Sequence, residues 1–160
     1  MKIFLIDAHN LIHKDSELKK KFIKNPETAS NSLLELIRLF SGKYPSYKFL
    51  VIFDGYFEGV SIPHPAITTI FSGKQTADTI IKEQIKNSLT TKNIVVVSSD
   101  AEVLSYSKIY SCELYTSEEF LLLIKPIEEI RISPKEQTKN EKPNYTSKKD
   151  MEFFKNLFKG

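Results

Sequence analysis

Continuous apolar runs recur along the chain, and segments with helically spaced apolar residues lie between them. The runs predict five strands, at residues 3–6, 48–54, 66–72, 93–100 and 112–116. Their apolar residues are mostly consecutive rather than alternating, which is typical of strands that are buried on both faces. Such strands, separated by helices, favour a parallel sheet with helices on either side. The pattern therefore predicts a three-layer α/β fold with a mostly parallel five-stranded sheet.

The segments between the runs predict helices at residues 16–24, 29–41, 76–89, 101–110 and 117–124. The second of these is expected to end at Gly42, because glycine commonly follows the last turn of a helix. In the third helix, the residues predicted to face the core are Ala77, Ile80, Ile81, Ile85 and Leu89.

Aspartates stand where the predicted strands end. Asp7, Asp54 and Asp100 close the first, second and fourth strands, and Asp78 begins the helix after the third. Because the carboxyl ends of parallel strands open at one edge of the sheet, these four side chains are expected to meet in one crevice. Crowded carboxylates repel one another unless a cation lies between them, and Mg²⁺ and Mn²⁺ prefer oxygen ligands. The sequence therefore predicts a metal site, although capping of the next helix is an alternative role for each aspartate.

Other chemistries need residues that the chain lacks near these aspartates. The segment after the first strand, "DAHNLIH", has no glycine for a phosphate-binding loop. His9 stands where an aspartyl-phosphate phosphatase would carry its second acid. His9 and His13 are four residues apart, but "HNLIH" lacks the glutamate of a zinc protease. We therefore expect packing or surface roles for both histidines.

The composition of the chain changes after residue 124. Residues 1–124 carry as many basic as acidic side chains, so the net charge of +3 comes from residues 125–160. Residues 125–147 hold three prolines among polar residues, which is typical of a flexible linker. Residues 148–160 predict a short amphipathic helix, which needs an acceptor for its apolar face. That acceptor is either its own domain or a protein partner.

Cysteine content and hydropathy indicate the compartment. Cys112 is the only cysteine, so no internal disulfide can form and a reducing environment is expected. No apolar run is long enough to span a bilayer, and the first residues do not resemble a targeting segment. The sequence therefore predicts a cytoplasmic protein that does not bind a membrane.

Five short motifs, in the order "LIDAHNLI", "VIFDG", "TADTII", "VVVSSDAEV" and "YTSEEFLLLI", resemble the YacP-like (NYN domain) ribonucleases of the PIN-like nuclease superfamily. The resemblance covers about residues 2–124. It implies a PIN-like sheet with strand order 3-2-1-4-5. It also implies that Asp7, Asp54, Asp78 and Asp100 match the acidic site of the family, with Asn10, Ser98 and Ser99 beside them. The chain departs from the family pattern at three places. The family usually has Gly-Tyr where this chain has Ala8–His9, often has Glu where Gln75 stands, and carries an extra acid near Lys82. These changes remove negative charge from the rim of the site.

The resemblance implies a metal-dependent endoribonuclease that uses Mg²⁺ or Mn²⁺ and leaves a 5′-phosphate and a 3′-hydroxyl, acting on mRNA or at the ribosome. All four aspartates are candidate metal ligands, Asn10 is expected to fix Asp7 or touch the phosphate, and Ser99 is expected to hydrogen-bond a ligand carboxylate. The candidate RNA-binding residues are Lys19, Lys20, Lys21, Lys24 and Lys74. Two alternatives stay open: an RNA- or ribosome-binding module without cleavage, and a nuclease that acts on DNA flaps.

Overall fold

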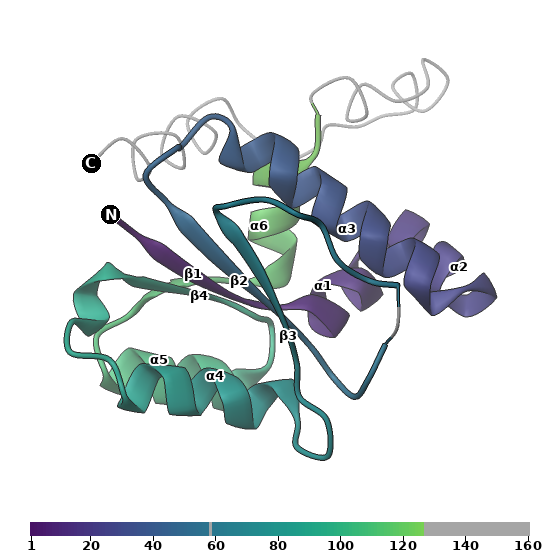
Figure 1. Cartoon of the computed structure of the whole chain (residues 1–160). Coiled ribbons are helices and arrows are strands. Elements are labelled where there is room, and N and C mark those ends of the chain that lie inside the picture. The colour runs from purple at the N-terminus through teal and green to yellow at the C-terminus, as the bar shows by residue number, and fades with distance from the viewer. Residues whose placement is uncertain (58, 127–160) are drawn as a thin grey trace, which may run out of the picture. The chain divides into compact units, whose positions relative to one another are not determined.

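The computed structural model describes residues 1–57 and 59–126 of the chain (Figure 1). Its strands are β1 (Ile3–Asp7), β2 (Lys48–Phe53), β3 (Ile67–Phe71), β4 (Ile94–Val97) and β5 (Glu113–Tyr115). Its helices are α1 (Ala8–Lys14), α2 (Ser16–Lys24), α3 (Pro26–Ser41), α4 (Ala77–Lys86), α5 (Ala101–Ile109) and α6 (Ser117–Ile124), with a short 3₁₀ turn at Thr91–Asn93.

The five strands form one sheet in the order β3-β2-β1-β4-β5, and every neighbouring pair is parallel. The central strand β1 pairs with β2 on one side, where Asp7 lies opposite Ile52, and with β4 on the other, where Ile6 lies opposite Val97. The predicted strand order is therefore confirmed.

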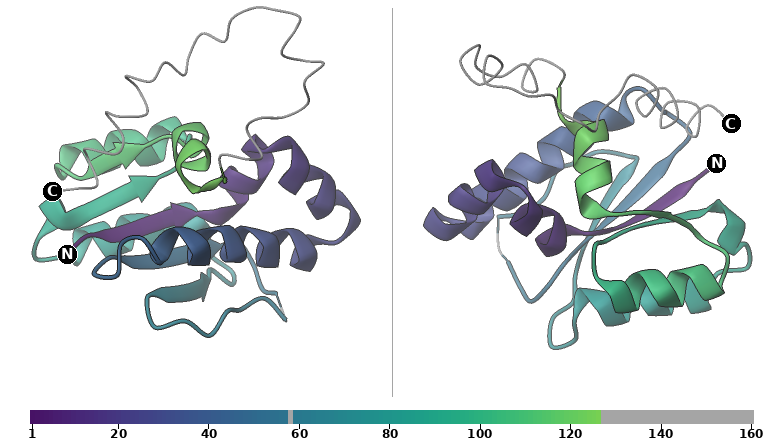
Figure 2. Two further views of the ribbon diagram at one scale, coloured as in Figure 1. Left: turned by 90° about the horizontal axis from the view of Figure 1, so that it is seen from above. Right: turned by 180° about the vertical axis from the view of Figure 1, so that it is seen from behind.

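Helices cover both faces of the sheet (Figures 1 and 2), which confirms the three layers. Successive residues of β1 point to opposite faces. Phe4 stacks on Phe49 of β2 with ring centroids 4.9 Å apart and also contacts Phe120 of α6. Leu5 belongs to the cluster on the other face, with Ile81 of α4 and Val103 of α5. A strand that is buried on both faces needs apolar residues throughout, which explains the continuous run before Asp7.

Three details differ from the expectations. The sequence pattern did not predict α1, whose buried residues Ala8, Leu11 and Ile12 have helical spacing. Helix α4 ends at Lys86, so Leu89 lies beyond it and is 100% exposed rather than directed into the core. Gly42 does follow α3, but its φ of −61° is right-handed, so the position does not require glycine.

The predicted linker from residue 127 onward and the predicted helix at 148–160 lie outside the described residues, so both stay predictions. Among the residues that are described, no helix combines the length and the apolar character needed to cross a membrane.

Candidate active site

A cavity of about 400 Å³ opens at the carboxyl ends of the strands. The chain order along the sheet reverses between β1 and β4, and ligands of open α/β sheets bind outside such a switch point. The cavity is lined by all four predicted aspartates and Asn10, and also by His9, His13, Lys14, Thr76 and Ala77. The predicted convergence of Asp7, Asp54, Asp78 and Asp100 is therefore what the structure shows.

Asp7 is the most deeply placed of these acids, at the last position of β1 and only 8% exposed. The pKa of its carboxyl is raised to about 6, mainly by burial and to a smaller extent by the charges of Asp54 and Asp78. The Ser98 hydroxyl donates a hydrogen bond of 3.1 Å to Asp7 Oδ2, which opposes that shift. Asp7 thus carries a buried negative charge that a bound cation would stabilise.

Asp54 follows β2 and connects two parts of the cavity wall. Its Oδ1 accepts a hydrogen bond of 2.7 Å from the backbone N–H of Ala77 at the start of α4. Its Oδ2 lies 3.3 Å from His9 Nδ1. Burial lowers the pKa of His9, and the charge of Asp54 opposes this effect. His9 is thus part of the cavity wall, a role beyond the packing or surface position that the sequence suggested.

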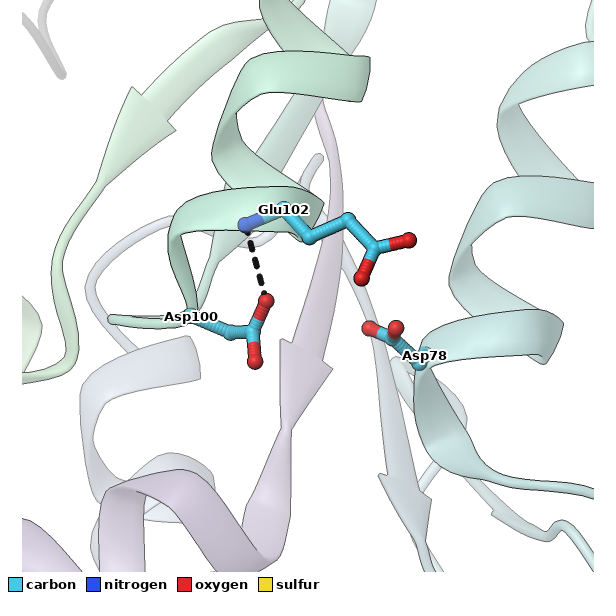
Figure 3. A group of neighbouring side chains, drawn as sticks. All are labelled: Asp78, Asp100 and Glu102. Carbon is cyan, nitrogen blue, oxygen red and sulfur yellow. Dashed lines mark hydrogen bonds between the residues drawn. The ribbon is translucent and has the colours of Figure 1, made fainter.

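Asp78, Asp100 and Glu102 form a second group, which we call the outer acids. One carboxylate oxygen from each lies within 4.8 Å of the others, and Figure 3 shows the three side chains gathered between α4 and the start of α5. Asp100 Oδ1 accepts hydrogen bonds from the backbone N–H groups of Glu102 at 2.9 Å and Val103 at 3.1 Å. Burial, followed by the charges of Asp100, Glu102 and Asp54, raises the pKa of Asp78, and Lys82 opposes this rise.

Lys82 of α4 neutralises part of the outer acids. Its Nζ donates to Glu102 Oε1 at 2.8 Å and lies 3.8 Å from Asp78 Oδ2. The hydrogen bond to Glu102 is the main reason that the pKa of Lys82 is raised. Lys82 also lies 5.6 Å from the centroid of the Tyr106 ring. The sequence did not single out Glu102, because an acid in the first turn of a helix is common. Glu102 gains its partners Asp78 and Lys82 only through the position of α4.

Hydrogen bonds among Asn10, Ser99 and Ser117 connect α1, the loop after β4 and the start of α6. The side-chain oxygen of Asn10 accepts hydrogen bonds from Ser99 N at 2.8 Å and from Ser117 Oγ at 2.7 Å. The Ser99 hydroxyl bonds Glu118 and accepts from Ser117 N at 2.9 Å. The hydroxyl that reaches a candidate ligand carboxylate is therefore that of Ser98, where the sequence had suggested Ser99.

The predicted basic residues lie on the surface and outside the cavity lining. Lys19, Lys20, Lys21 and Lys24 are exposed on α2, and Lys74 is exposed in the turn after β3. The lysine that lines the cavity is Lys14, at the last position of α1. Lys14 was missed because a single lysine at a helix end is typical of a solvated surface.

Helix capping explains only part of this arrangement. Asp100 does cap α5, but Asp7 makes no side-chain cap bond to α1. Asp54 bonds the N-terminus of α4, which lies far along the chain from it. Oxygen donors in this number, with one of them buried at the sheet edge, fit a hard divalent cation such as Mg²⁺ or Mn²⁺.

The fold is thus a doubly wound parallel sheet with an acidic cavity at its switch point, the place where such sheets bind their ligands. The chain matches the family model of the YacP-like NYN domain over residues 4–159 and belongs to that family. Family and fold together indicate a PIN-like nuclease. The match extends through the region in which the sequence predicts a linker and a helix.

The solved structures that resemble this chain include two of one protein. One is Rae1 (YacP) from Bacillus subtilis, with a TM-score of 0.65 and 23% identity over 99% of this chain and 94% of that chain. The other is the W164L mutant of the same protein, with a TM-score of 0.66 and 23% identity over 81% of this chain and 79% of that chain. These similarities confirm the fold. No curated protein matches the chain in sequence.

Proposed function

We propose that this protein is a metal-dependent endoribonuclease that hydrolyses RNA and leaves a 5′-phosphate and a 3′-hydroxyl. The observation that carries the proposal is the meeting of Asp78 and Asp100 with Asp7 and Asp54 in one cavity, with Glu102 beside the first two. Asp78, Asp100 and Glu102 would hold a Mg²⁺ or Mn²⁺ ion, with Asp7 and Asp54 as further carboxylates of the same site. The ion, when bound, supplies a water of lowered pKa and neutralises charge that develops on the phosphate.

The other residues of the cavity position these acids. Ser98 orients Asp7 through its hydroxyl, and His9 orients Asp54 through Nδ1. Asn10 and Ser99 fix the loop between β4 and Asp100 against the start of α6. Such supporting hydrogen bonds keep ligand carboxylates in one orientation and commonly affect affinity and activity.

The choice of RNA as substrate is supported by the family resemblance and by basic residues in and near the cavity. Lys14 at the cavity, Lys74 at its rim and the lysines of α2 supply positive charge for a phosphate backbone. We extend the proposal to an activity in the cytoplasm on mRNA, free or at the ribosome. The competing functions, RNA or ribosome binding without cleavage and cleavage of DNA flaps, are outcomes of the test below.

The test is incubation of the full chain with end-labelled RNA in Mn²⁺ or Mg²⁺, with and without a chelator. We expect cleavage that requires the ion and products with 3′-hydroxyl ends that a poly(A) polymerase can extend. The Asp100→Asn variant should lose most of its activity, and Glu35→Gln, which changes an exposed acid paired with Arg38 on α3, should match the wild type. RNA binding without cleavage would overturn the proposal in favour of a binding module. Faster cleavage of the matching DNA would overturn the choice of RNA.

A further inference from the structure

One aromatic side chain stands open to solvent close to the cavity. Tyr56 is 75% exposed, and among the described residues no other phenylalanine or tyrosine is as open to solvent. Its neighbour Phe57 points the other way and packs on His9, with ring centroids 5.5 Å apart, and on Phe53 and Phe71. The loop after β2 is thus anchored by one ring and presents the next ring outward.

The loop that carries Tyr56 is fastened to the turn after β3. Gly55 N donates to Ser72 Oγ at 3.0 Å, and Gly73 N donates to Gly55 O at 3.1 Å. The Tyr56 ring lies directly against Gly73, where an added Cβ would be 2.8 Å from the tyrosine hydroxyl oxygen. Gly73 also has a φ of +64°, a left-handed backbone conformation that favours glycine. Tyr56 is therefore exposed but held in place.

The turns that carry Tyr56 and Gly73 adjoin the wall of the cavity, and we call them the rim. Asp54, two residues before Tyr56, lines the cavity and bonds Ala77 N. Thr76 and Ala77, just after the Gly73 turn, line it as well. Lys74 is exposed in the same turn, so an open aromatic ring and a lysine are carried by the two turns that lead into the cavity wall.

We propose that Tyr56 is a stacking platform for one unpaired nucleobase of a single-stranded nucleic acid whose backbone enters the acidic cavity, with Lys74 beside a neighbouring phosphate. The proposal deepens the proposed function, on which it rests, by naming single-stranded substrate. A single exposed ring suits one planar base, whereas an amphipathic helix needs several apolar anchors in a groove. The neighbouring turn also carries an exposed lysine, and sites for single strands combine aromatic rings with positive charge.

Binding is measured in chelator, so that no strand is cut, with a short oligouridylate and with an oligomer of the same sugar-phosphate backbone that lacks bases. We expect wild type to prefer the base-bearing strand by about tenfold, a typical effect of one stacked base. Tyr56→Ala should remove that preference and Tyr56→Phe should keep it. Ile109→Ala, an exposed apolar residue at the far end of α5, is the control and should keep it too.

A second variant gives a direct signal. The chain has no tryptophan, so Tyr56→Trp introduces a single one, and stacking of a base should quench its fluorescence when the oligouridylate binds but not when the baseless strand binds. Gly73→Ala in the Tyr56→Trp protein should weaken the quenching, because the added methyl displaces the ring.

The proposal is overturned if wild type binds both strands equally, if Tyr56→Ala weakens both equally, or if the quenching is the same with both strands. Its failure is distinct from failure of the nuclease proposal, because cleavage by wild type is scored separately with the ion present. If the stacking tests fail while the wild type still cleaves RNA, only the proposal of a stacking platform is overturned.

Discussion

The two sides of the cavity carry the same kind of side chain in opposite surroundings. On the β1 side, Asp7 is buried, and burial and neighbouring carboxylates raise its pKa to about 6. On the α4 and α5 side, the outer acids are half-buried or exposed, and Lys82 already supplies a positive charge. A divalent ion would relieve the buried charge on the first side, whereas on the second it would compete with an ammonium group for the same oxygens. The comparison predicts that the two sides respond differently to substitution.

The largest effect is expected at Asp100, the outer acid whose backbone N–H donates to the Ser98 hydroxyl that also bonds Asp7. Asp100→Asn removes one ligand charge but keeps an oxygen that can accept the cap bonds from Glu102 and Val103. We expect cleavage to fall by a factor on the order of a hundred to a thousand, as when one electrostatic stabiliser of a transition state is removed. Unfolding measured in chelator should show an unchanged or slightly higher melting temperature. A folded variant with full activity would contradict the assignment of Asp100.

The next largest effect is expected for Asp7→Asn, as a gain in the free energy of unfolding measured in chelator. The carboxyl of Asp7 has a pKa of about 6 in the folded protein against an ordinary value of 3.8, so the unfolded state loses its proton first as the pH rises. The folded state therefore loses stability between about pH 4 and pH 6, and asparagine avoids this loss. At pH 7.5 the variant should gain up to about 3 kcal/mol of unfolding free energy, and at pH 3.5 almost nothing.

Asp15→Asn is the matched control for this prediction. Asp15 is also 8% exposed, but its carboxylate caps α2 by accepting a hydrogen bond of 2.9 Å from Leu18 N. Because asparagine caps about as well as aspartate, we expect no gain at pH 7.5. Equal gains in both variants would mean that burial of an acid in general, rather than the setting of Asp7, controls the result.

A smaller effect is expected on the outer side. Lys82→Met removes the charge that occupies the outer acids, so Mn²⁺ should bind more tightly, by a factor on the order of ten. The ion-free protein should be less stable, because the three carboxylates then repel one another without compensation. Calorimetry and melting temperatures across an Mn²⁺ series measure both changes. Lys86→Met, one turn further along α4, is the control, and identical Mn²⁺ affinities in the two variants would exclude competition by Lys82.

The sequence was sufficient for the sheet and for the convergence of the four aspartates. Apolar runs as continuous as that before Asp7 are compatible with few structures other than a strand buried on both faces, and parallel strands bring their carboxyl ends together. Helix boundaries were harder to predict. The spacing of Leu89 continues the pattern of α4, but the helix ends at Lys86, and nothing in the spacing marks that end.

Contacts between distant segments could not be predicted from the residues. Glu102 becomes a candidate ligand only because α4 places Asp78 and Lys82 opposite it. Ser98 and Ser99 are adjacent and chemically identical, yet their hydroxyls bond Asp7 and Glu118 respectively. Such choices depend on the direction in which the chain leaves β4, which the pattern of residues does not encode locally.

The last prediction uses these two serines to test whether the inner and outer sides are connected. Ser98 is fully buried; its hydroxyl donates to Asp7 Oδ2 at 3.1 Å and accepts from Asp100 N at 3.1 Å. Ser98→Ala should lower stability at pH 7.5 by about 1 to 2 kcal/mol, because a hydrogen bond to a charged group is lost. It should also raise the pKa of Asp7 further, which NMR titration of the carboxyl carbon measures.

Ser99→Ala is the matched control, since its hydroxyl contacts the more exposed Glu118 and should leave the pKa of Asp7 unchanged. In the Asp7→Asn background the cost of Ser98→Ala should shrink, because a neutral acceptor makes the weaker bond, and the difference is the coupling energy of the pair. Equal costs in both backgrounds would show that Ser98 supports only the backbone of Asp100. A smaller cost in the Asp7→Asn background would show that the Ser98 hydroxyl stabilises the buried charge of Asp7, and the cost that persists would be its contribution through the bond from Asp100 N.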